Sequence, residues 1–567
     1  MKNKNTFILG ITGAALVVVA SLAAYYSHLV PNRLLPTTGS TTTPIVSYSG
    51  PNNSTRPTMT EEDKQQADAP GDKSPTSQSA APETPIKKPA ETKNAPKQEQ
   101  IRQTVTEEQL YYPLALPNDP GYNASWALQR LNAPSAWNIS TGSTSTVVAV
   151  IDTGFALEHE DLRDSWFIND NETGMTAAGS TCWTGTPLDK RTNSCDDDGN
   201  GYVDDYRGWN FYLQDNNPQT GRDNPNGAGV AHGTETAGLV GATGNNGKGI
   251  ATLNWATKIM PLQALSDDGP GYTSDVAAAI YYAVDNGATT ISMSLGGSDF
   301  DPWIEDAVEY AYANNIPVIA AAGNCGTGSE GGCEGLPAGT MTYPALFDHV
   351  ISVGASDTNN QRASFSSYGP RLDIVAPGSG TIVSPTWTPA NGTSLYSGAL
   401  YGTSYAAPQI ASLVSLIKAI RPASDVNDIR ALVMATASKP AAMNGAVYTN
   451  HLGHGVANAG QALSVASALN STTSTPKLLQ VGGSKSEHSY TPGESLGSGC
   501  VSQNNSYCTV LLRNDSTGAE RYLPYQQIND TTSGWTWSTN ILGANGWWDA
   551  RAQQGNELST AYSLFNK

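Results

Sequence analysis

The pattern of apolar and polar positions changes character several times along the chain. From about position 111, short apolar runs rich in β-branched residues alternate with longer stretches of helical period. The predicted buried strands cover 146–151, 258–262, 290–294, 317–322 and 350–353. The predicted helices include 274–286, 302–314 and 405–420. Strands separated by helices predict βαβ units and an α/β fold, in which a parallel sheet carries helices on both faces and ligands bind at the carboxyl ends of the strands.

The N-terminal part of the chain has a different pattern. Lys2 and Lys4 precede a mostly apolar run over 7–26, which is long enough to cross a bilayer as a helix or to act as an export signal. The following segment is rich in Pro, Thr, Ser, Lys, Glu and Gln, so it cannot bury enough surface to offset the entropy of ordering. We therefore predict a signal peptide or signal-anchor transmembrane helix over 1–27 and a disordered stalk over 28–108.

A further change of composition occurs near residue 470, at a short polar linker. The region beyond it contains several tryptophans, many Gly, Asn and Ser residues, and short alternating runs such as 509–513. We predict that the α/β domain spans 111–469 and that a small β-rich domain spans 476–567. The tryptophans either fill a small β core or bind a surface or glycan ligand, and the sequence leaves both interpretations open.

The charge of the chain restricts its partners. Its 567 residues include 50 acidic and 31 basic side chains, a net charge of -19 that argues against nucleic acid and anionic membrane surfaces. The hydrophobic content of 38% is low for one compact globule and agrees with an unpacked segment. We expect an extracellular monomer that is secreted, or that is anchored to the membrane by the N-terminal helix if this helix is not cleaved.

Six cysteines form three pairs that are local in sequence. Fifteen pairings are formally possible for six cysteines, but the clustering favours disulfides between sequence neighbours. No Cys/His spacing typical of zinc sites occurs. The expected bonds are Cys182–Cys195, Cys325–Cys333 and Cys500–Cys508.

Three separated motifs contain candidate catalytic residues. Asp152 follows the strand at 146–151 directly in a D-T-G motif, His232 begins H-G-T-E-T-A-G, and Ser404 lies in G-T-S at the start of the predicted helix 405–420. A serine hydroxyl needs an adjacent base, an imidazole serves as that base near pH 7, and a buried carboxylate fixes the tautomer of the imidazole. A helix N-terminus favours the negative charge that develops there. We therefore interpret Asp152, His232 and Ser404 as a catalytic triad.

Taken in this order on a parallel α/β pattern, the three motifs resemble the subtilase family of serine proteases over about 115–465. The resemblance implies a subtilisin-like fold and an extracellular endopeptidase that hydrolyses polypeptides through an acyl-enzyme intermediate. It also implies that the amide of Asn324, at the end of A-A-A-G-N, stabilises the oxyanion together with the backbone N–H of Ser404. The segment implied to bind extended substrate main chain comprises Ser294, Leu295 and Gly296.

An insertion at about 165–230 separates Asp152 from His232 and departs from the family pattern. It contains an acidic run that resembles the opening of an EF-hand-type calcium loop, although Arg207 replaces the closing Glu. The candidate calcium ligands in this run are Asp196, Asp198, Asn200, Asp204 and Asp205. A solvated acidic turn is the alternative. A second candidate calcium site combines Asp161 with Asn245 in the loop 243–249, which matches the calcium loop of the family in position.

Two other functions fit the same features. One is a surface-tethered processing protease with a single dedicated partner, which the stalk and the possible anchor favour. The other is an adhesion or binding protein with an inactive protease fold, against which the intact candidate residues argue. No folded inhibitory prosegment is evident before Tyr111, because that stretch lacks apolar residues.

Overall fold

A computed structural model describes residues 44–47, 115–328, 333, 335–390 and 392–469, together with segments between 477 and 566. The predicted helix in 1–27 and most of the predicted stalk lie outside these residues. None of the helices in the described ranges combines the length and the apolar character needed to cross a membrane. Below, the α/β region means residues 115–469, and the C-terminal β region means the described segments within 477–566.

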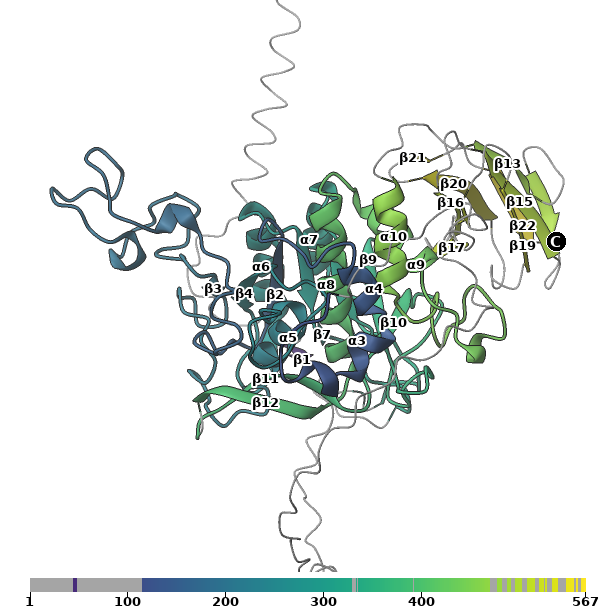
Figure 1. Cartoon of the computed structure of the whole chain (residues 1–567). Coiled ribbons are helices and arrows are strands. Elements are labelled where there is room, and N and C mark those ends of the chain that lie inside the picture. Colours follow the sequence, from purple (N-terminus) through teal and green to yellow (C-terminus); the bar gives the residue numbers. More distant parts are fainter. Residues whose placement is uncertain are drawn as a thin grey trace, which may run out of the picture. The chain divides into compact units, whose positions relative to one another are not determined.

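A seven-stranded parallel sheet forms the centre of the α/β region (Figure 1). Its order is β10-β9-β8-β6-β2-β4-β3. The strands are β2 (Val147–Asp152), β3 (Trp209–Asn210), β4 (Lys258–Gln263), β6 (Thr290–Met293), β8 (Val318–Ala321), β9 (Val350–Ser356) and β10 (Ile374–Pro377). The five strands predicted from the sequence correspond to β2, β4, β6, β8 and β9, and the predicted α/β fold class is confirmed.

Helices cover both faces of this sheet, which explains why the strand segments are apolar without interruption. In β2, Val148 and Val150 pack into one hydrophobic core, while Ala149 and Ile151 pack into the other. The first core includes α8 and the second includes α6 and α7. The helices are α3 (Trp126–Arg130), α4 (Ala133–Trp137), α5 (His232–Gly241), α6 (Thr273–Asp285), α7 (Pro302–Ala313), α8 (Thr403–Ile420), α9 (Val426–Ala435) and α10 (Ala459–Leu469). Short 3-10 helices occur at η2 (Tyr122–Ala124), η3 (Asp170–Glu172), η4 (Lys190–Thr192) and η5 (Ala441–Met443).

Two smaller sheets accompany the central one. An antiparallel pair consists of β11 (Ile382–Thr388) and β12 (Gly392–Leu400). A three-stranded antiparallel sheet has the order β5-β1-β7, from β5 (Pro270–Tyr272), β1 (Pro44–Ser47) and β7 (Leu295–Gly296). The sequence predicted disorder throughout 28–108, so β1 is unexpected. It forms through pairing with strands more than 200 positions away in sequence, which a local pattern does not contain.

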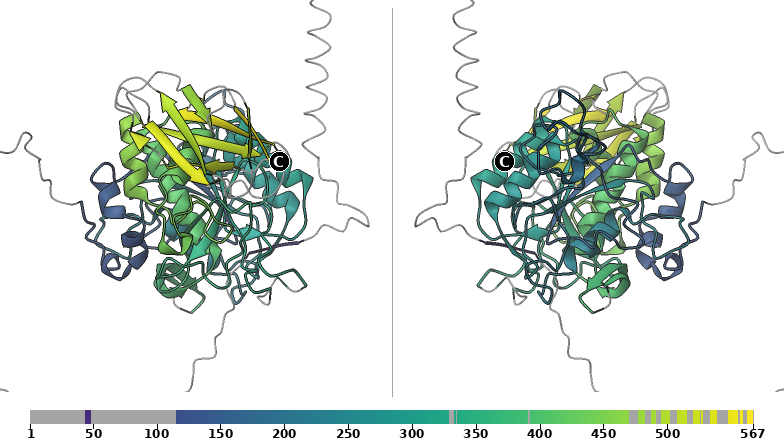
Figure 2. Two further views of the ribbon diagram at one scale, coloured as in Figure 1. Left: turned by 90° about the vertical axis from the view of Figure 1, so that its right-hand side faces the viewer. Right: turned by 90° about the vertical axis from the view of Figure 1, so that its left-hand side faces the viewer.

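The C-terminal β region contains two sheets, ordered β13-β15-β19 and β14-β22-β20-β16-β17. Their pairings are antiparallel except between β14 and β22. The strands are β13 (Lys477–Val481), β14 (Glu487–Tyr490), β15 (Ser495–Val501), β16 (Tyr507–Asn514), β17 (Glu520–Tyr522), β18 (Gln526–Gln527), β19 (Ser533–Ser538), β20 (Trp547–Gln554), β21 (Glu557–Leu558) and β22 (Tyr562–Asn566). Figure 2 shows these strands, in yellow, beside the green helices, and β16 contacts both α9 and α10.

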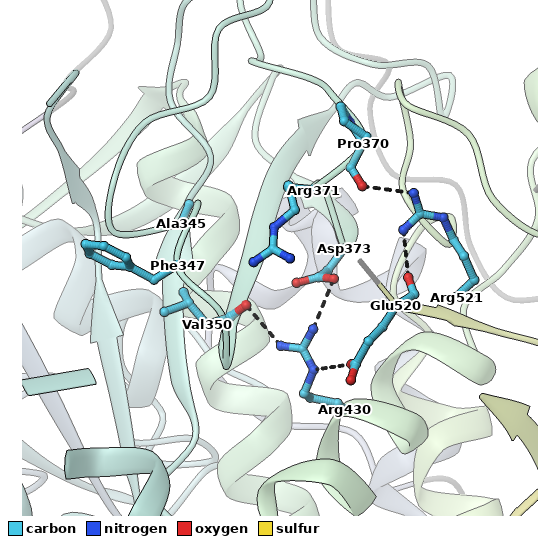
Figure 3. Close-up of a pocket in the computed structure, with 9 residues that line it drawn as sticks. All are labelled: Ala345, Phe347, Val350, Pro370, Arg371, Asp373, Arg430, Glu520 and Arg521. Carbon is cyan, nitrogen blue, oxygen red and sulfur yellow. Dashed lines mark hydrogen bonds and ion pairs between the residues drawn. The ribbon is translucent and has the colours of Figure 1, made fainter. Parts of the chain in front are cut away.

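A buried ion-pair network joins α9 to β17 (Figure 3). The Arg430 side chain lies 3.1 Å from Glu520 and 3.3 Å from Asp373, and it donates to the carbonyl of Val350. Burial lowers the pKa of Arg430, but the carboxylates of Asp373 and Glu520 outweigh that effect and raise it. The guanidinium therefore stays charged, and its removal would leave two buried carboxylates without their counter-charge.

A second contact across the same boundary depends on the protonation of His454. The backbone N–H of Tyr522 donates to Nε2 of His454 at 2.9 Å, so Nε2 must be an acceptor and the proton resides on Nδ1. Nδ1 then donates to the carbonyl of Asp373 at 2.8 Å. Burial, followed by the charges of Lys439 and Arg521, lowers the pKa of His454 well below its ordinary value of 6.5. The neutral ring is therefore part of the folded structure.

We expect the stability of the protein to fall as the pH drops below 6.5, because the unfolded state then binds a proton at His454 that the folded state excludes. His454→Gln offers one donor and one acceptor but does not titrate, so it should reduce this pH dependence. Thermal unfolding at pH 7, 6 and 5 measures the difference. The exposed His451, changed to Gln, is the control: its pKa is lowered, but not as far as that of buried His454, so it should reduce the slope much less than His454→Gln does. Equal slopes for His454→Gln and wild type would contradict the prediction.

Candidate active site

The fold brings the candidate catalytic residues together at one end of the central sheet. Asp152 ends β2, Ser294 follows β6 and Asn324 follows β8, which are consecutive strands in the sheet. His232 begins α5 and Ser404 lies in the first turn of α8, two helices that contact each other. Carboxyl ends of parallel strands and N-termini of helices thus converge on one place, as expected for a site on such a sheet.

Asp152 and His232 form a buried, directly hydrogen-bonded pair. His232 Nδ1 lies 2.7 Å from Asp152 Oδ1, and the side chains are 2% and 0% exposed. Oδ1 also accepts from the backbone N–H of Thr153 at 2.7 Å, and Oδ2 accepts from the hydroxyl of Thr236 at 3.0 Å. Because the carboxylate accepts at Nδ1, the ring has its proton there and Nε2 has the lone pair. This tautomer is the one that a general base needs.

The contacts around this pair explain why the D-T-G and H-G motifs contain these residue types. The hydroxyl of Thr153 donates to the carbonyl of Gly229 at 2.8 Å and accepts from the N–H of Gly233 at 3.1 Å. Gly154 has φ of +135°, a conformation that favours glycine. A Cβ on Gly233 would lie 2.3 Å from the carbonyl oxygen of Gly154. The backbones of the D-T-G and H-G motifs therefore contact each other directly, and a side chain at Gly233 would prevent this contact.

Ser404 is buried next to the end of β6. Its Oγ donates to the carbonyl of Ser294 at 3.4 Å, and Oγ of Ser294 donates to the carbonyl of Ser404 at 2.7 Å. The ring of the next residue, Tyr405, lies 5.8 Å from the ring of His232 between centroids. These contacts place the hydroxyl of Ser404 beside the segment predicted to bind substrate, and they place the next residue, Tyr405, beside His232.

Asn324 is oriented by the residue that precedes Ser404. Both the backbone N–H and the hydroxyl of Thr403 donate to Oδ1 of Asn324 at 3.0 Å. A backbone N–H can only donate, so the atom that faces Thr403 is the oxygen, and the nitrogen is at the other end of the carboxamide. The Cys325–Cys333 disulfide begins at the next residue. This bond and Cys182–Cys195 are confirmed, whereas the side chains of Cys500 and Cys508 lie outside the described residues.

A buried acid that was not predicted from the sequence connects the helices that carry His232 and Ser404. Glu235 lies one turn after His232, and its carboxylate accepts from the hydroxyls of Tyr405 and Thr386, each at 2.7 Å. Burial raises the pKa of Glu235, and the hydroxyl bonds oppose that rise. Glu235 thereby links α5 to α8 and to β11. Its signal in the sequence is an acidic residue in the otherwise uncharged stretch from His232 to Gly241.

In the insertion, three carboxylates meet, two of which belong to the predicted set and one of which was not predicted. Ligand oxygens of Glu172, Asp196 and Asp198 lie within 4.8 Å of one another. Asn200 and Asp205 adjoin the group, because the amide of Asn200 contacts carboxylate oxygens of Asp198 and Asp205. The carboxylate of Asp204 lies apart from them and accepts from the N–H of Ser194. Glu172 lies too far upstream in sequence for loop spacing to suggest it.

The surroundings of Glu172 fit a bound cation. Its Oε1 accepts from the N–H groups of Asp197 and Asp198 at 2.7 and 3.0 Å, whereas its buried Oε2 has no hydrogen-bond partner among the described residues. Burial, together with the neighbouring carboxylates of Asp205 and Asp198, raises the pKa of Glu172 to about 7. A cluster of carboxylate oxygens is the type of ligand set that calcium prefers, so the residues present fit this ion.

In the second predicted calcium site, the loop 243–249 does lie beside Asp161, but Asn246 contacts this residue in place of the predicted Asn245. Asp161 accepts from the amide of Asn246 at 2.8 Å and from the N–H of Ile250 at 2.9 Å. Asn245 faces Asp119 instead, since its N–H donates to that carboxylate at 2.6 Å. Burial raises the pKa of Asp161 to about 6. The loop 243–249 thus lies against Asp161, and it contacts this residue through Asn246.

Comparison with known proteins agrees with this geometry. The model of the subtilase family matches residues 143–455. Thermitase of Thermoactinomyces vulgaris is 32% identical over 325 residues, which cover 57% of this chain and 92% of that protein. Subtilisin Savinase of Lederbergia lenta is 30% identical over 338 residues, 59% of this chain and 96% of that protein. Halolysin of Haloferax mediterranei is 31% identical over 315 residues, 56% of this chain and 49% of that protein.

We expect Tyr405→Phe to lower the free energy of unfolding by about 1–3 kcal/mol, because it leaves Oε2 of buried Glu235 without its hydroxyl donor. Denaturant unfolding of the two proteins measures the loss. Tyr272→Phe is the matched control, since Tyr272 is 49% exposed and its change should stay within about 0.5 kcal/mol. Similar stability for Tyr405→Phe and Tyr272→Phe would show that the buried bond does not stabilise the fold.

Proposed function

Because the chain belongs to the subtilase family of serine endopeptidases, we propose that it cleaves polypeptides with Asp152, His232 and Ser404 as its catalytic residues. The observation that carries this proposal is the buried contact of 2.7 Å between His232 Nδ1 and Asp152 Oδ1, beside the helix that begins at Thr403. An exposed or misaligned imidazole could not combine that tautomer with a neighbouring serine.

Each residue has a defined role in the proposed reaction. Ser404 Oγ attacks the carbonyl carbon of the scissile bond, and His232 Nε2 accepts the hydroxyl proton. Nδ2 of Asn324 and the backbone N–H of Ser404 donate to the oxyanion. His232 then protonates the leaving amine, and water hydrolyses the acyl-enzyme. Asp152 holds the imidazole in position and stabilises its charged form.

We propose that substrate binds as an extended strand along β7, where Ser294, Leu295 and Gly296 present backbone groups beside Ser404. Addition of a strand to a sheet edge uses main-chain hydrogen bonds and therefore accepts many sequences. This mode favours an endopeptidase of broad specificity.

We place the enzyme outside the cell. Two disulfides occur among the described residues, which suits an oxidising compartment. One relative, 28% identical, carries the description of an extracellular serine protease. The signal or anchor at 1–27, the stalk at 28–108, the peptidase domain at 111–469 and the β domain at 476–567 belong to this proposal. A monomeric state and a surface or glycan ligand of the C-terminal domain remain predictions.

We further propose that calcium binds Glu172, Asp196 and Asp198, with Asn200 and Asp205 beside them. The close approach of three carboxylates and the buried Oε2 of Glu172 support this site. The ion would supply the positive charge that these oxygens lack and hold η3 to the acidic run of the insertion. Asp161 and the loop that contains Asn245 form the second proposed site.

A fluorophosphonate probe tests the proposed catalytic function. We expect it to label the wild type at Ser404 and to leave Ser404→Ala unlabelled, because only an activated serine reacts. Casein digestion should disappear in the same variant. For Asn324→Ala we expect a fall in turnover of about 10²–10³, the effect established for the loss of one oxyanion donor.

Ser397→Ala, a change in β12, serves as the control and should be labelled like the wild type. Absence of labelling in folded wild-type protein would refute the proposed triad and favour an inactive binding protein. Retained labelling in Ser404→Ala would show that another residue is the nucleophile.

Calcium should raise the thermal midpoint of unfolding, and at a hundred times its dissociation constant it should stabilise the fold by about 2.7 kcal/mol. We expect Glu172→Gln to remove the part of this gain that depends on the insertion, and titration calorimetry should show one site fewer. Asp189→Asn is the control, because Asp189 pairs with Arg191 in the same insertion, outside the cluster. Equal calcium binding by Glu172→Gln and wild type would contradict this site.

A further inference from the structure

A buried serine outside the proposed triad lies against the segment that contains Asn324. Ser367 ends the sequence R-A-S-F-S-S at 362–367, in the connection between β9 and β10, and it is completely buried. The proposed reaction gives Ser367 no role. Its hydrogen bonds nevertheless converge on the backbone of the residue that is proposed to donate to the oxyanion.

Ser367 holds the chain on both sides of Asn324. Its backbone N–H donates to the carbonyl of Gly323 at 2.9 Å, and its Oγ accepts from the N–H of Cys325 at 3.0 Å. The carbonyl of Gly323 belongs to the peptide unit that enters Asn324, and the N–H of Cys325 belongs to the peptide unit that leaves it. A single residue therefore fixes both peptide units that join Asn324 to the chain.

The hydroxyl of Ser367 has a fixed orientation. It donates its proton to the carbonyl of Thr340 at 2.6 Å, which leaves a lone pair directed to the N–H of Cys325. Thr340 and Cys325 also form a β-bridge with each other, so the three residues belong to one backbone arrangement. Of the two groups bonded to this hydroxyl, one needs a donor and the other an acceptor, and an alanine at position 367 would supply neither.

The glycine before Asn324 allows this close approach. Gly323 has φ of +106°, a conformation that favours glycine, and a Cβ there would lie 2.9 Å from Oγ of Ser367 and 3.0 Å from Oγ1 of Thr342. A larger residue would therefore displace the serine or rotate the peptide. The glycine of A-A-A-G-N and the last serine of R-A-S-F-S-S thus fit each other.

We infer that Ser367 is a positioning residue for the oxyanion donor, an inference that rests on the proposed function. Asn324 is held at two ends: Thr403 donates to Oδ1 of its carboxamide, and Ser367 bonds to the peptide units on either side of its Cα. With the backbone and the oxygen both fixed, the direction of Nδ2 is fixed as well. Ser367 does not touch the substrate and acts through Asn324 alone.

The position of Nδ2 decides how well it stabilises the transition state. An oxyanion donor acts at about 2.7–3.1 Å from the developing charge, and a displacement of about 1 Å can cost about 10²-fold in rate. The oxyanion forms in the transition state and is absent from the bound peptide. A misplaced donor should therefore lower kcat and leave KM nearly unchanged.

Steady-state kinetics on a fluorogenic peptide, built around a bond that the wild type cleaves in casein, test the inference. In Ser367→Ala we expect kcat to fall about tenfold, with KM within about twofold of the wild-type value. Ser367→Cys fills the same space with a thiol that hydrogen-bonds weakly, and it should lower kcat about threefold. This second variant supplies the same measurement if Ser367→Ala does not fold.

A double-mutant cycle separates positioning of Asn324 from a general loss of structure. Once the amide is absent, the serine has nothing left to position, so Asn324→Ala combined with Ser367→Ala should have the kcat of Asn324→Ala alone. Ser352→Ala is the matched control. Ser352 is equally buried, and its Oγ accepts from the N–H of Asp373 at 2.8 Å and donates to the carbonyl of Arg371 at 2.6 Å. We expect Ser352→Ala to lose stability as Ser367→Ala does and to keep the wild-type kcat.

The outcomes separate this inference from the proposed function. Wild-type protein that neither reacts with the fluorophosphonate nor cleaves casein would overturn the proposed function itself. An active wild type whose kcat is unchanged by both substitutions of Ser367 would overturn the positioning role and leave the protease intact. The same conclusion would follow from an equal fall in kcat in the wild-type and Asn324→Ala backgrounds, or from a similar fall in Ser352→Ala.

Discussion

The hydrogen bond between Asp152 and His232 is the constraint on which the arrangement of the site depends. It joins the end of β2 to the start of α5, although an insertion of more than 60 residues separates them in sequence. The imidazole can serve as a base only if its Nδ1 proton faces a carboxylate, so the backbone around both residues must allow that approach. Gly154 and Gly233 allow it, and the hydroxyls of Thr153 and Thr236 hold it.

A second buried acid, Glu235, connects the helix that carries Ser404 to the helix that carries His232. Glu235 lies on the same helix as His232 and bonds to Tyr405, the neighbour of Ser404 on α8. A buried carboxylate is costly unless hydroxyl or amide donors satisfy it, and here two hydroxyls do so. The two helices that position the base and the nucleophile are therefore coupled by the same polar contact.

Features encoded by adjacent residues could be predicted from the sequence, and features formed between distant segments could not. The strands at the centre of the sheet are continuous apolar runs. In D-T-G, H-G-T and G-T-S, the candidate catalytic residue is adjacent to the residues that set its backbone conformation. Glu172 joins Asp196 and Asp198 only because η3 folds back onto the acidic run, and no spacing rule contains that contact. Asn246 rather than Asn245 faces Asp161 for a similar reason, since Asn245 adopts φ of +58° and bonds to Asp119. The strand β1 is the extreme case, because its partners belong to a distant part of the chain.

The physics of the cleft accounts for that strand. β5 and β7 are short and present backbone groups toward a gap one strand wide, so any extended segment that reaches the gap can pair on both sides. A site that recognises main chain has little means of rejecting its own polypeptide. Discrimination must then come from which tethered segment is extended and β-branched, and Ile45 and Val46 meet that condition in a stretch otherwise dominated by Pro, Thr, Ser and charged residues. The backbone recognition that suits a broad protease thus also accommodates a segment of its own chain, the strand β1.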